Sequence, residues 1–120
     1  MTIPTDPAHA SRVSAADANS SEVVACVSKL KALADGTRLA VMEALMDGPQ
    51  RVGELGERLG VEQSLLSHHL RVLRELGLIQ AERVGKSVVY GLAPETGGSG
   101  DERALDLGCC RLSFEESGDA

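Results

Sequence analysis

The most regular hydrophobic pattern in the chain lies between Gln63 and Gly77. Leucines recur there at the three- and four-residue spacing of one helical face, at Leu66, Leu70, Leu73 and Leu76. The opposite face carries hydroxyl, imidazole and guanidinium groups, on Ser64, Ser67, His68, Arg71 and Arg74. Such groups suit base edges and phosphates, although ordinary surface helices also carry a solvated polar face. The pattern predicts an amphipathic helix, and the elements beside it indicate what its polar face does.

Two neighbouring patterns indicate a winged helix-turn-helix. After the helix, residues 81–92 alternate between polar and apolar around Gly85-Lys86, as the strands of a β-hairpin do. Before it, Val52–Leu59 is typical of a short helix, and Gly60-Val61 leaves room only for a tight turn. Two helices joined in this way form a helix-turn-helix, whose second helix enters the major groove of DNA. We therefore predict a mainly α fold with a small β-hairpin, of the winged helix-turn-helix class.

Two further helices are predicted upstream of this motif. The first runs from Ser21 to about Ala34, and the second runs from Thr37 to the break at Gly48-Pro49. The predicted organisation is a disordered tail (1–20), a winged helix-turn-helix domain (21–94), and a flexible linker with an acidic segment that carries a vicinal cysteine pair (95–120). Whether residues 104–114 form a helix or an extended segment stays open at this point.

The formal net charge of −6 would disfavour binding to nucleic acid if it were spread evenly along the chain, but it is not. Residues 21–94 hold nine basic and nine acidic side chains, and the acidic excess lies outside them. Phosphates respond to a local cationic strip more than to the global charge. The chain has one Tyr, one Phe and no Trp, so its core must be small and aliphatic, which favours a dimer.

The hydropathy pattern also bears on the compartment and on the class of function. No apolar run approaches the roughly 18 residues of a membrane span, and no secretory signal precedes the first helix. We therefore expect a cytoplasmic protein with no membrane partner, whose three cysteines are reduced. An enzyme is not expected, because no base is placed beside a nucleophile and no phosphate-binding loop is present.

The segment from Val27 to Leu92 resembles the ArsR/SmtB family of dimeric winged-helix repressors. Its markers are the LADGTRL run at Leu33–Leu39, the SHHL of Ser67–Leu70, and the RVGK and YGL pieces of the hairpin. Two positions depart from the family pattern: Gly36 stands where Pro is usual, and Glu62 stands where Ser usually caps the recognition helix. Neither departure alters the predicted fold.

The resemblance implies a homodimer that binds double-stranded operator DNA. The positions at which relatives contact DNA correspond here to Gln63, Ser64, Ser67, His68 and Arg71 on the helix, and to Arg83 and Lys86 on the wing. His69 lies beside the apolar edge of the helix, where we expect a structural histidine bonded to nearby backbone. Arg74 is either a solvated charge or a further contact.

Members of this family release DNA when an inducer binds, and the cysteines are the candidate ligands. The Cys-x-Cys that holds soft metals in some relatives would fall at Arg51 and Gly53, so that site is absent. The histidines (His9, His68 and His69) do not match the Asp/His pairs that hold zinc in others. Cys109-Cys110 remain, with Cys26 as a third thiolate, and thiolates select soft ions. We therefore predict a repressor with no obligatory cofactor that As(III), Sb(III) or a similar thiophilic ion releases from DNA.

Other interpretations of the cysteines stay open. Two or three thiols suffice for a disulfide switch, so an oxidant or a reactive sulfur species is the second candidate for the inducer. Alternatively, Cys26 is a small buried hydrophobe and Cys109-Cys110 merely pack beside Leu107, Leu112 and Phe114. The protein would then bind DNA constitutively, with structural cysteines.

Overall fold

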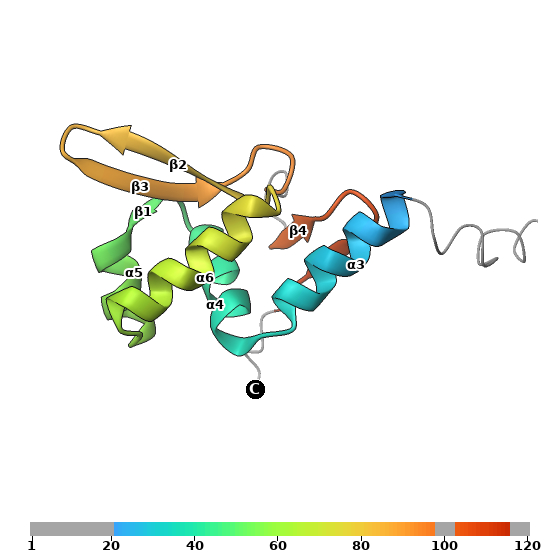
Figure 1. The fold of residues 1–120 in the computed structure, drawn as a ribbon, viewed down its shortest axis with the longest axis horizontal. Helices are drawn as coiled ribbons and strands as arrows, with labels where there is room; N and C mark the ends of the chain where they lie inside the picture. Colours follow the sequence, from blue (N-terminus) through green and yellow to red (C-terminus); the bar gives the residue numbers. More distant parts are fainter. Residues whose placement is uncertain (1–20, 98–102, 116–120) are drawn as a thin grey trace, which may run out of the picture.

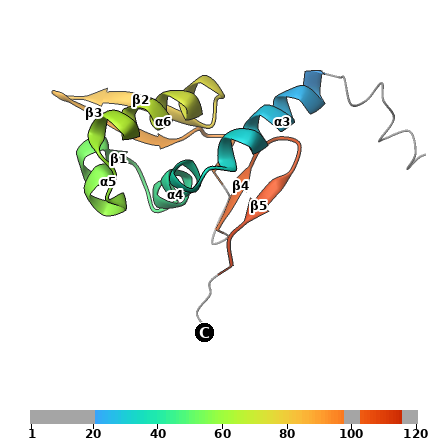
Figure 2. The same ribbon diagram turned by 60° about the horizontal axis from the view of Figure 1, so that its bottom comes forward.

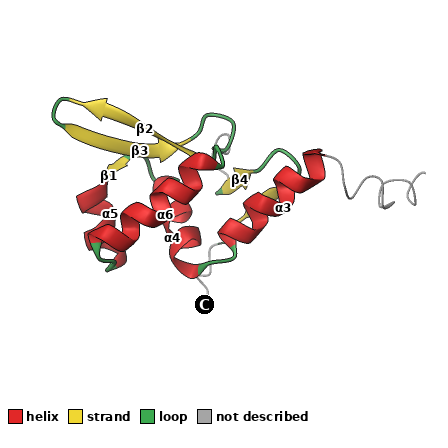
Figure 3. Ribbon diagram, viewed as in Figure 1, coloured by secondary structure: helices red, strands yellow, loops and turns green. Residues whose placement is uncertain are grey.

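The computed structural model describes residues 21–97 and 103–115. The predicted tail (1–20), most of the glycine-rich linker (98–102) and the last residues (116–120) lie outside the described residues. The elements, drawn in Figures 1 and 3, are α3 (Ser21–Leu33), α4 (Gly36–Leu45), β1 (Gln50–Arg51), α5 (Val52–Leu59), α6 (Gln63–Glu75), β2 (Ile79–Val84), β3 (Ser87–Leu92), β4 (Ala104–Asp106) and β5 (Arg111–Ser113). None of the helices in this described part is long and apolar enough to cross a membrane.

The helix-turn-helix is present as predicted. α5 has the predicted bounds, and it ends at Gly60, whose left-handed φ of 67° suits a residue without a Cβ. α6 begins at Gln63 as predicted and ends at Glu75, two residues before the predicted Gly77. Gly77 also has a positive φ, and beyond it the N–H of Leu78 donates to the carbonyl of Leu73.

The start of α4 corrects one prediction. We expected Thr37 to begin this helix, but α4 begins at Gly36 and Asp35 is its N-cap. The Asp35 carboxylate accepts from the N–H of Arg38 at 3.0 Å, and so it satisfies one of the N–H groups that a helix start leaves without a partner.

The wing is the predicted hairpin with one strand added. β2 and β3 are antiparallel, and the register runs from Ile79 opposite Leu92 to Val84 opposite Ser87. β1, which was not predicted, pairs with the other edge of β3, so the sheet order is β1-β3-β2. A strand of two residues is too short to show a hydrophobic period, which explains why the sequence did not reveal it.

The C-terminal segment is extended and belongs to the core. β4 and β5 form an antiparallel hairpin, which lies beside α3 and α4 in Figure 2. Leu105 and Leu107 are 0% and 2% exposed, and they join the cluster that contains the buried leucines of α6. The N–H of Asp106 also donates to the carbonyl of Thr96 at 2.9 Å. This hairpin is therefore an integral layer of the domain, on the side of α4 opposite the wing (Figures 1 and 2).

Candidate functional site

The polar face of α6 is open to solvent because its leucines hold the other face in the core. Leu66, Leu70 and Leu73 are each at most 1% exposed. The predicted DNA-contacting side chains of this helix, which are Gln63, Ser64, Ser67, His68 and Arg71, are all exposed. This arrangement presents hydrogen-bonding groups in a row along a rigidly anchored helix.

The N-terminus of α6 is arranged around Glu62. Glu62, which stands where Ser usually caps this helix, is the N-cap residue of α6, and its side chain makes no capping hydrogen bond. Instead, its carboxylate accepts from the hydroxyl of Ser64, with both oxygens 2.9 Å from Oγ. The Ser64 hydroxyl is therefore held at the start of the exposed face.

A hollow of about 160 Å³ lies beside the middle of α6. Its lining residues are Ser67, Leu70, Arg71, Arg74 and Tyr90. Two guanidinium-bearing and two hydroxyl-bearing side chains thus line one concave spot, which is a donor set that suits a phosphate. Arg74, whose role the sequence left open, contributes to this hollow together with Arg71.

The predicted wing contacts lie at the far end of the hairpin. Arg83 is exposed on β2, and Lys86 is exposed in the turn that follows Gly85. Gly85 has a φ of 64°, which is the backbone conformation that this tight turn requires.

His69 is buried, but its partner differs from the prediction. The residue is 8% exposed, as expected for a structural histidine. Its Nδ1 is hydrogen-bonded to Nη1 of Arg38 at 3.1 Å, whereas we expected a backbone partner. A guanidinium donates readily and accepts nothing, so it is a strong partner for a ring nitrogen at the edge of the core. Sequence reasoning gave Arg38 no role, although it stands in the quoted LADGTRL run.

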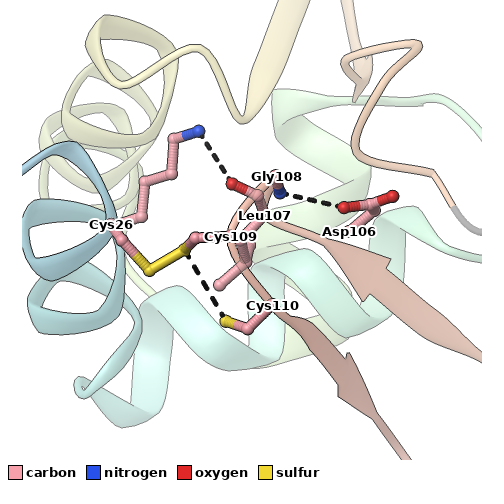
Figure 4. Close-up of a disulfide and its surroundings, with 7 residues drawn as sticks. Cys26, Asp106, Leu107, Gly108, Cys109 and Cys110 are labelled. Atoms are coloured by element: carbon pink, nitrogen blue, oxygen red, sulfur yellow. Dashed lines mark hydrogen bonds between the residues drawn. A yellow bond between two sulfur atoms is a disulfide. The ribbon is translucent and has the colours of Figure 1, made fainter. Parts of the chain in front are cut away.

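The three cysteines come together within one chain. Cys26 on α3 meets Cys109 and Cys110 in the turn between β4 and β5, and their sulfur atoms all lie within 4.8 Å of one another. This is the one group of three or more potential metal ligands in the described part of the chain. Figure 4 shows the sulfur atoms of Cys26 and Cys109 joined to each other, with the sulfur of Cys110 beside them.

The redox state of the cluster differs from the expectation of reduced thiols. Cys26 and Cys109 form a disulfide between residues 83 apart in the sequence. Their Cα atoms are 6.0 Å apart, a separation that a disulfide spans without moving the backbone. Cys110 is free and exposed, with its Sγ 3.9 Å from that of Cys109.

The turn that carries the vicinal cysteines is held by several hydrogen bonds. The N–H of Leu107 donates to the carbonyl of Cys110, and the N–H of Gly108 donates to the Asp106 carboxylate, each at 2.9 Å. Lys29, one turn after Cys26 on α3, donates from Nζ to the carbonyl of Leu107 at 3.1 Å. The sequence gave no signal for Lys29, because a lysine on a helix is usually a solvated charge.

Two arginines, one from α5 and one from the segment before β4, form hydrogen bonds with carboxylates at the C-terminal end of α4. Asp47 accepts from Arg58 of α5 and also from Arg103 of the hairpin segment, which in turn reaches Glu43. Hydrogen bonds from Arg58, and then from Arg103, lower the pKa of Asp47 below its ordinary value. The backbone N–H of Arg38 likewise lowers the pKa of Asp35. Both carboxylates are thus stabilised as anions in the folded chain.

The fold and the exposed helix define the class as winged-helix regulators, and comparison with known proteins agrees. Residues 35–81 match the family described as "Bacterial regulatory protein, arsR family". Over 65 residues the chain is 51% identical to the transcriptional regulator NmtR of Mycobacterium tuberculosis, covering 54% of each chain. The structure of HlyU from Vibrio cholerae is 38% identical with a TM-score of 0.58, covering 61% of this chain and 79% of that one. The chain belongs to the arsR family of bacterial regulatory proteins.

A further structural neighbour is a related domain whose oligomeric state is known. It is the homodimeric winged helix-turn-helix DNA-binding domain of Mb0332 from Mycobacterium bovis, a possible ArsR-family regulator. It is 26% identical with a TM-score of 0.59, covering 79% of this chain and 78% of that one. The chain spans about half the length of curated relatives such as NmtR and CmtR. Both of these relatives are transcriptional regulators of the helix-turn-helix type.

Proposed function

We propose that the chain is a homodimeric repressor that binds operator DNA through α6 and the wing, and leaves it when a thiophilic ion binds the cysteine cluster. As(III) and Sb(III) are the favoured ions. The observation that carries the sensing role is the convergence of three sulfur atoms from α3 and the β4–β5 turn within 4.8 Å.

The surface of α6 supports the DNA-binding part. Its exposed hydroxyl, amide and imidazole groups suit base edges, and the hollow between Arg71, Arg74 and Tyr90 suits a backbone phosphate. Lys86 would meet the flanking DNA from the tip of the wing. The relatives' role as regulators supports the same assignment.

An apolar stripe on α3 supports the dimer. Val24, Val27 and Leu30 recur at intervals of three residues, and they are 53%, 43% and 43% exposed. Side chains three apart share one face of a helix, so this stripe is a surface that a second copy of α3 would cover. The homodimeric state of the Mb0332 domain is consistent with that occupant.

The donor set of the cluster fits a thiophilic ion. The Sγ atoms of Cys109 and Cys110 are 3.9 Å apart, so both sulfurs are close enough to bind one ion. Cys26 supplies the third sulfur once its disulfide is reduced to two thiols. Thiolates are soft ligands, so such a site prefers soft ions over hard ones.

The test is arsenite titration of the fully reduced protein on a DNA fragment that it binds specifically. We expect arsenite to weaken binding roughly 5- to 150-fold, the usual range of such couplings. The double variant Cys109→Ser/Cys110→Ser should lose the response, and Cys26→Ser should weaken it. Ser113→Ala, an exposed change in the same hairpin, is the matched control and should respond normally. Zn(II) should act much more weakly, because no histidine of the described chain joins the cluster.

The Cys26–Cys109 disulfide favours a second candidate, a thiol switch. A peroxide would take two electrons and two protons from the two thiols and would be reduced to water, leaving the disulfide between α3 and the turn. Peroxide and a persulfide therefore replace arsenite in parallel titrations. Release by these reagents but not by arsenite would assign the sensing role to redox chemistry. Release by none of them would leave a constitutive DNA-binding protein with structural cysteines.

A further inference from the structure

Arg38 contacts three elements at once. Its backbone N–H donates to the Asp35 cap of α4, and its Nε donates to the carbonyl of Ala32 in the last turn of α3, at 2.7 Å. Its Nη1 reaches Nδ1 of His69 on α6 at 3.1 Å. The side chain is only 18% exposed, so these contacts are largely shielded from water.

The α3 end of this connection leads to the cysteines. The last four carbonyls of a helix lack intrahelical partners, and Arg38 satisfies the one on Ala32. Cys26 lies six residues earlier on the same helix, about 9 Å along its axis. Lys29, between them, holds the carbonyl of Leu107 in the cysteine turn. A change in the cluster that moves α3 therefore moves the acceptor that Arg38 binds.

The α6 end of the connection leads to the DNA-reading side chains. Because guanidinium donates, Nδ1 of His69 is the acceptor and the ring proton is on Nε2. The His69 ring lies 5.4 Å, between centroids, from the ring of His68 on the exposed face. No buried side-chain nitrogen or oxygen in the described residues lacks a partner. Loss of the Arg38 contact would leave a buried ring nitrogen unpaired, which is costly unless α6 shifts.

We propose that Arg38 is a positioning residue that transmits the state of the cysteine cluster from α3 to the reading helix α6. The proposal rests on the proposed function, since it takes the cluster as the sensor and α6 as the reader. A change in the cluster that displaced α3 relative to α4 would break the Arg38 hydrogen bond to Ala32, and the same side chain would then lose its position against His69. The alternative role for Arg38 is purely structural, and it predicts loss of stability without loss of communication.

The first experiment measures communication without DNA. The histidine rings are labelled with ¹⁵N, and the His69 signals are recorded for reduced, oxidised and arsenite-treated protein. In the wild type, the His69 Nδ1 signal should change with the state of the cysteines. In Arg38→Gln it should stop responding, while the arsenite affinity stays within about threefold. An unresponsive His69 in the wild type, or an equal response in Arg38→Gln, overturns the proposal whatever the protein does to DNA.

The second experiment measures release from DNA in the same proteins. Arg38→Lys keeps the positive charge, so it should disturb the fold less than Arg38→Gln. Its single ammonium group replaces the two separate nitrogens that bind Ala32 and His69, so it should not make both contacts. We expect the effect of arsenite on DNA affinity to fall from roughly 5- to 150-fold to less than about threefold. Arg51→Lys, which changes an exposed arginine paired with its own neighbour Glu54, is the matched control and should keep the full effect. A full effect in Arg38→Lys overturns the proposal. Absence of release in the wild type would instead refute the proposed function, while the His69 signal still decides the role of Arg38.

Discussion

The two regions that we propose for reading DNA (the reading half) and for sensing (the sensing end) are built in different ways. The reading half, from β1 to β3, uses consecutive elements joined by short turns, and its exposed groups lie on one helix and one hairpin. The sensing end joins α3, near the start of the domain, to the C-terminal hairpin. The two cysteines that connect them are 83 residues apart in the sequence. Local periodicity therefore describes the first region, whereas only tertiary structure creates the second.

This difference implies a division of labour. The reading half can keep its groups aligned without help, because its leucines are anchored in the core. At the sensing end, α3 is tied to the cysteine turn by the Cys26–Cys109 disulfide and by the hydrogen bond from Lys29 to Leu107. A change at these ties alters how α3 meets a hairpin that is itself packed in the core through Leu105 and Leu107.

The largest effect is expected from removing two reading groups together. In Ser67→Ala/His68→Ala, both changed side chains are exposed, so the fold should survive while specific DNA affinity falls roughly 30-fold or more. Binding titrations on specific and random duplexes measure the difference. Ser28→Ala on α3 is the control and should bind like the wild type. Retained specific affinity in the double variant would remove the reading role from this face of α6.

Prediction from the sequence succeeded where the signal was local. The leucine period of α6, the bounds of α5 and the alternation of the wing are all confirmed by the structure. The C-terminal hairpin could not be predicted because its three-residue strands are too short to show a period. The sequence could name Cys26, Cys109 and Cys110 as candidates. Only the folded structure shows that the three sulfur atoms come together within one chain.

A core substitution tests whether the two regions fold as one unit. Leu105→Ala in β4 and Leu73→Ala in α6 both truncate side chains with 0% exposure, so each should lower the free energy of unfolding by about 2–5 kcal/mol. Urea titrations followed by circular dichroism of the helices measure it, since the chain has no Trp. Leu65→Ala, 49% exposed, should change it by no more than about 0.5 kcal/mol. If Leu105→Ala left the helical transition unchanged, the sensing end would be a separate folding unit.

A smaller effect is expected at the tip of the wing. Lys86→Ala should weaken binding to all sequences by a similar factor, because a phosphate contact carries no sequence information. The slope of log affinity against log salt concentration should become shallower by about one. Lys31→Ala, an exposed lysine on α3, should leave both quantities unchanged if the sensing end stays away from DNA. A loss confined to one sequence would make Lys86 a base-reading residue.

Arg38 and Lys29 show what sequence reasoning cannot supply. Each is a long cation on a helix, and nothing in the pattern distinguishes it from a solvated charge. Their acceptors are backbone carbonyls and a ring nitrogen on other elements, namely Ala32, Leu107 and His69. Such partners become visible only when the helices are packed.

The smallest effect concerns Asp47, which joins the two regions through Arg58 of α5 and Arg103 of the hairpin segment. These hydrogen bonds lower its pKa in the folded chain, whereas the unfolded chain keeps the ordinary value of about 3.9. The unfolded state therefore binds the proton more readily. The stabilisation is fully present above about pH 4, and it is lost as the pH falls through the lowered folded pKa.

Asp47→Asn should accordingly make stability less dependent on pH below about 4, as measured by acid titration with circular dichroism. Asp35→Asn is the comparison, because the lowered pKa of Asp35 arises at the helix cap beside Arg38 and not between the two regions. The side chain of Asp47 is 44% exposed, so added salt should diminish its contribution. Because Asp47 is paired with both regions, its replacement should also shift the acid-induced loss of hairpin contacts to higher pH. Amide exchange at Leu105 and Leu107 would detect that shift. Equal acid sensitivity of those amides in both variants would show that the bridge does not couple the two regions.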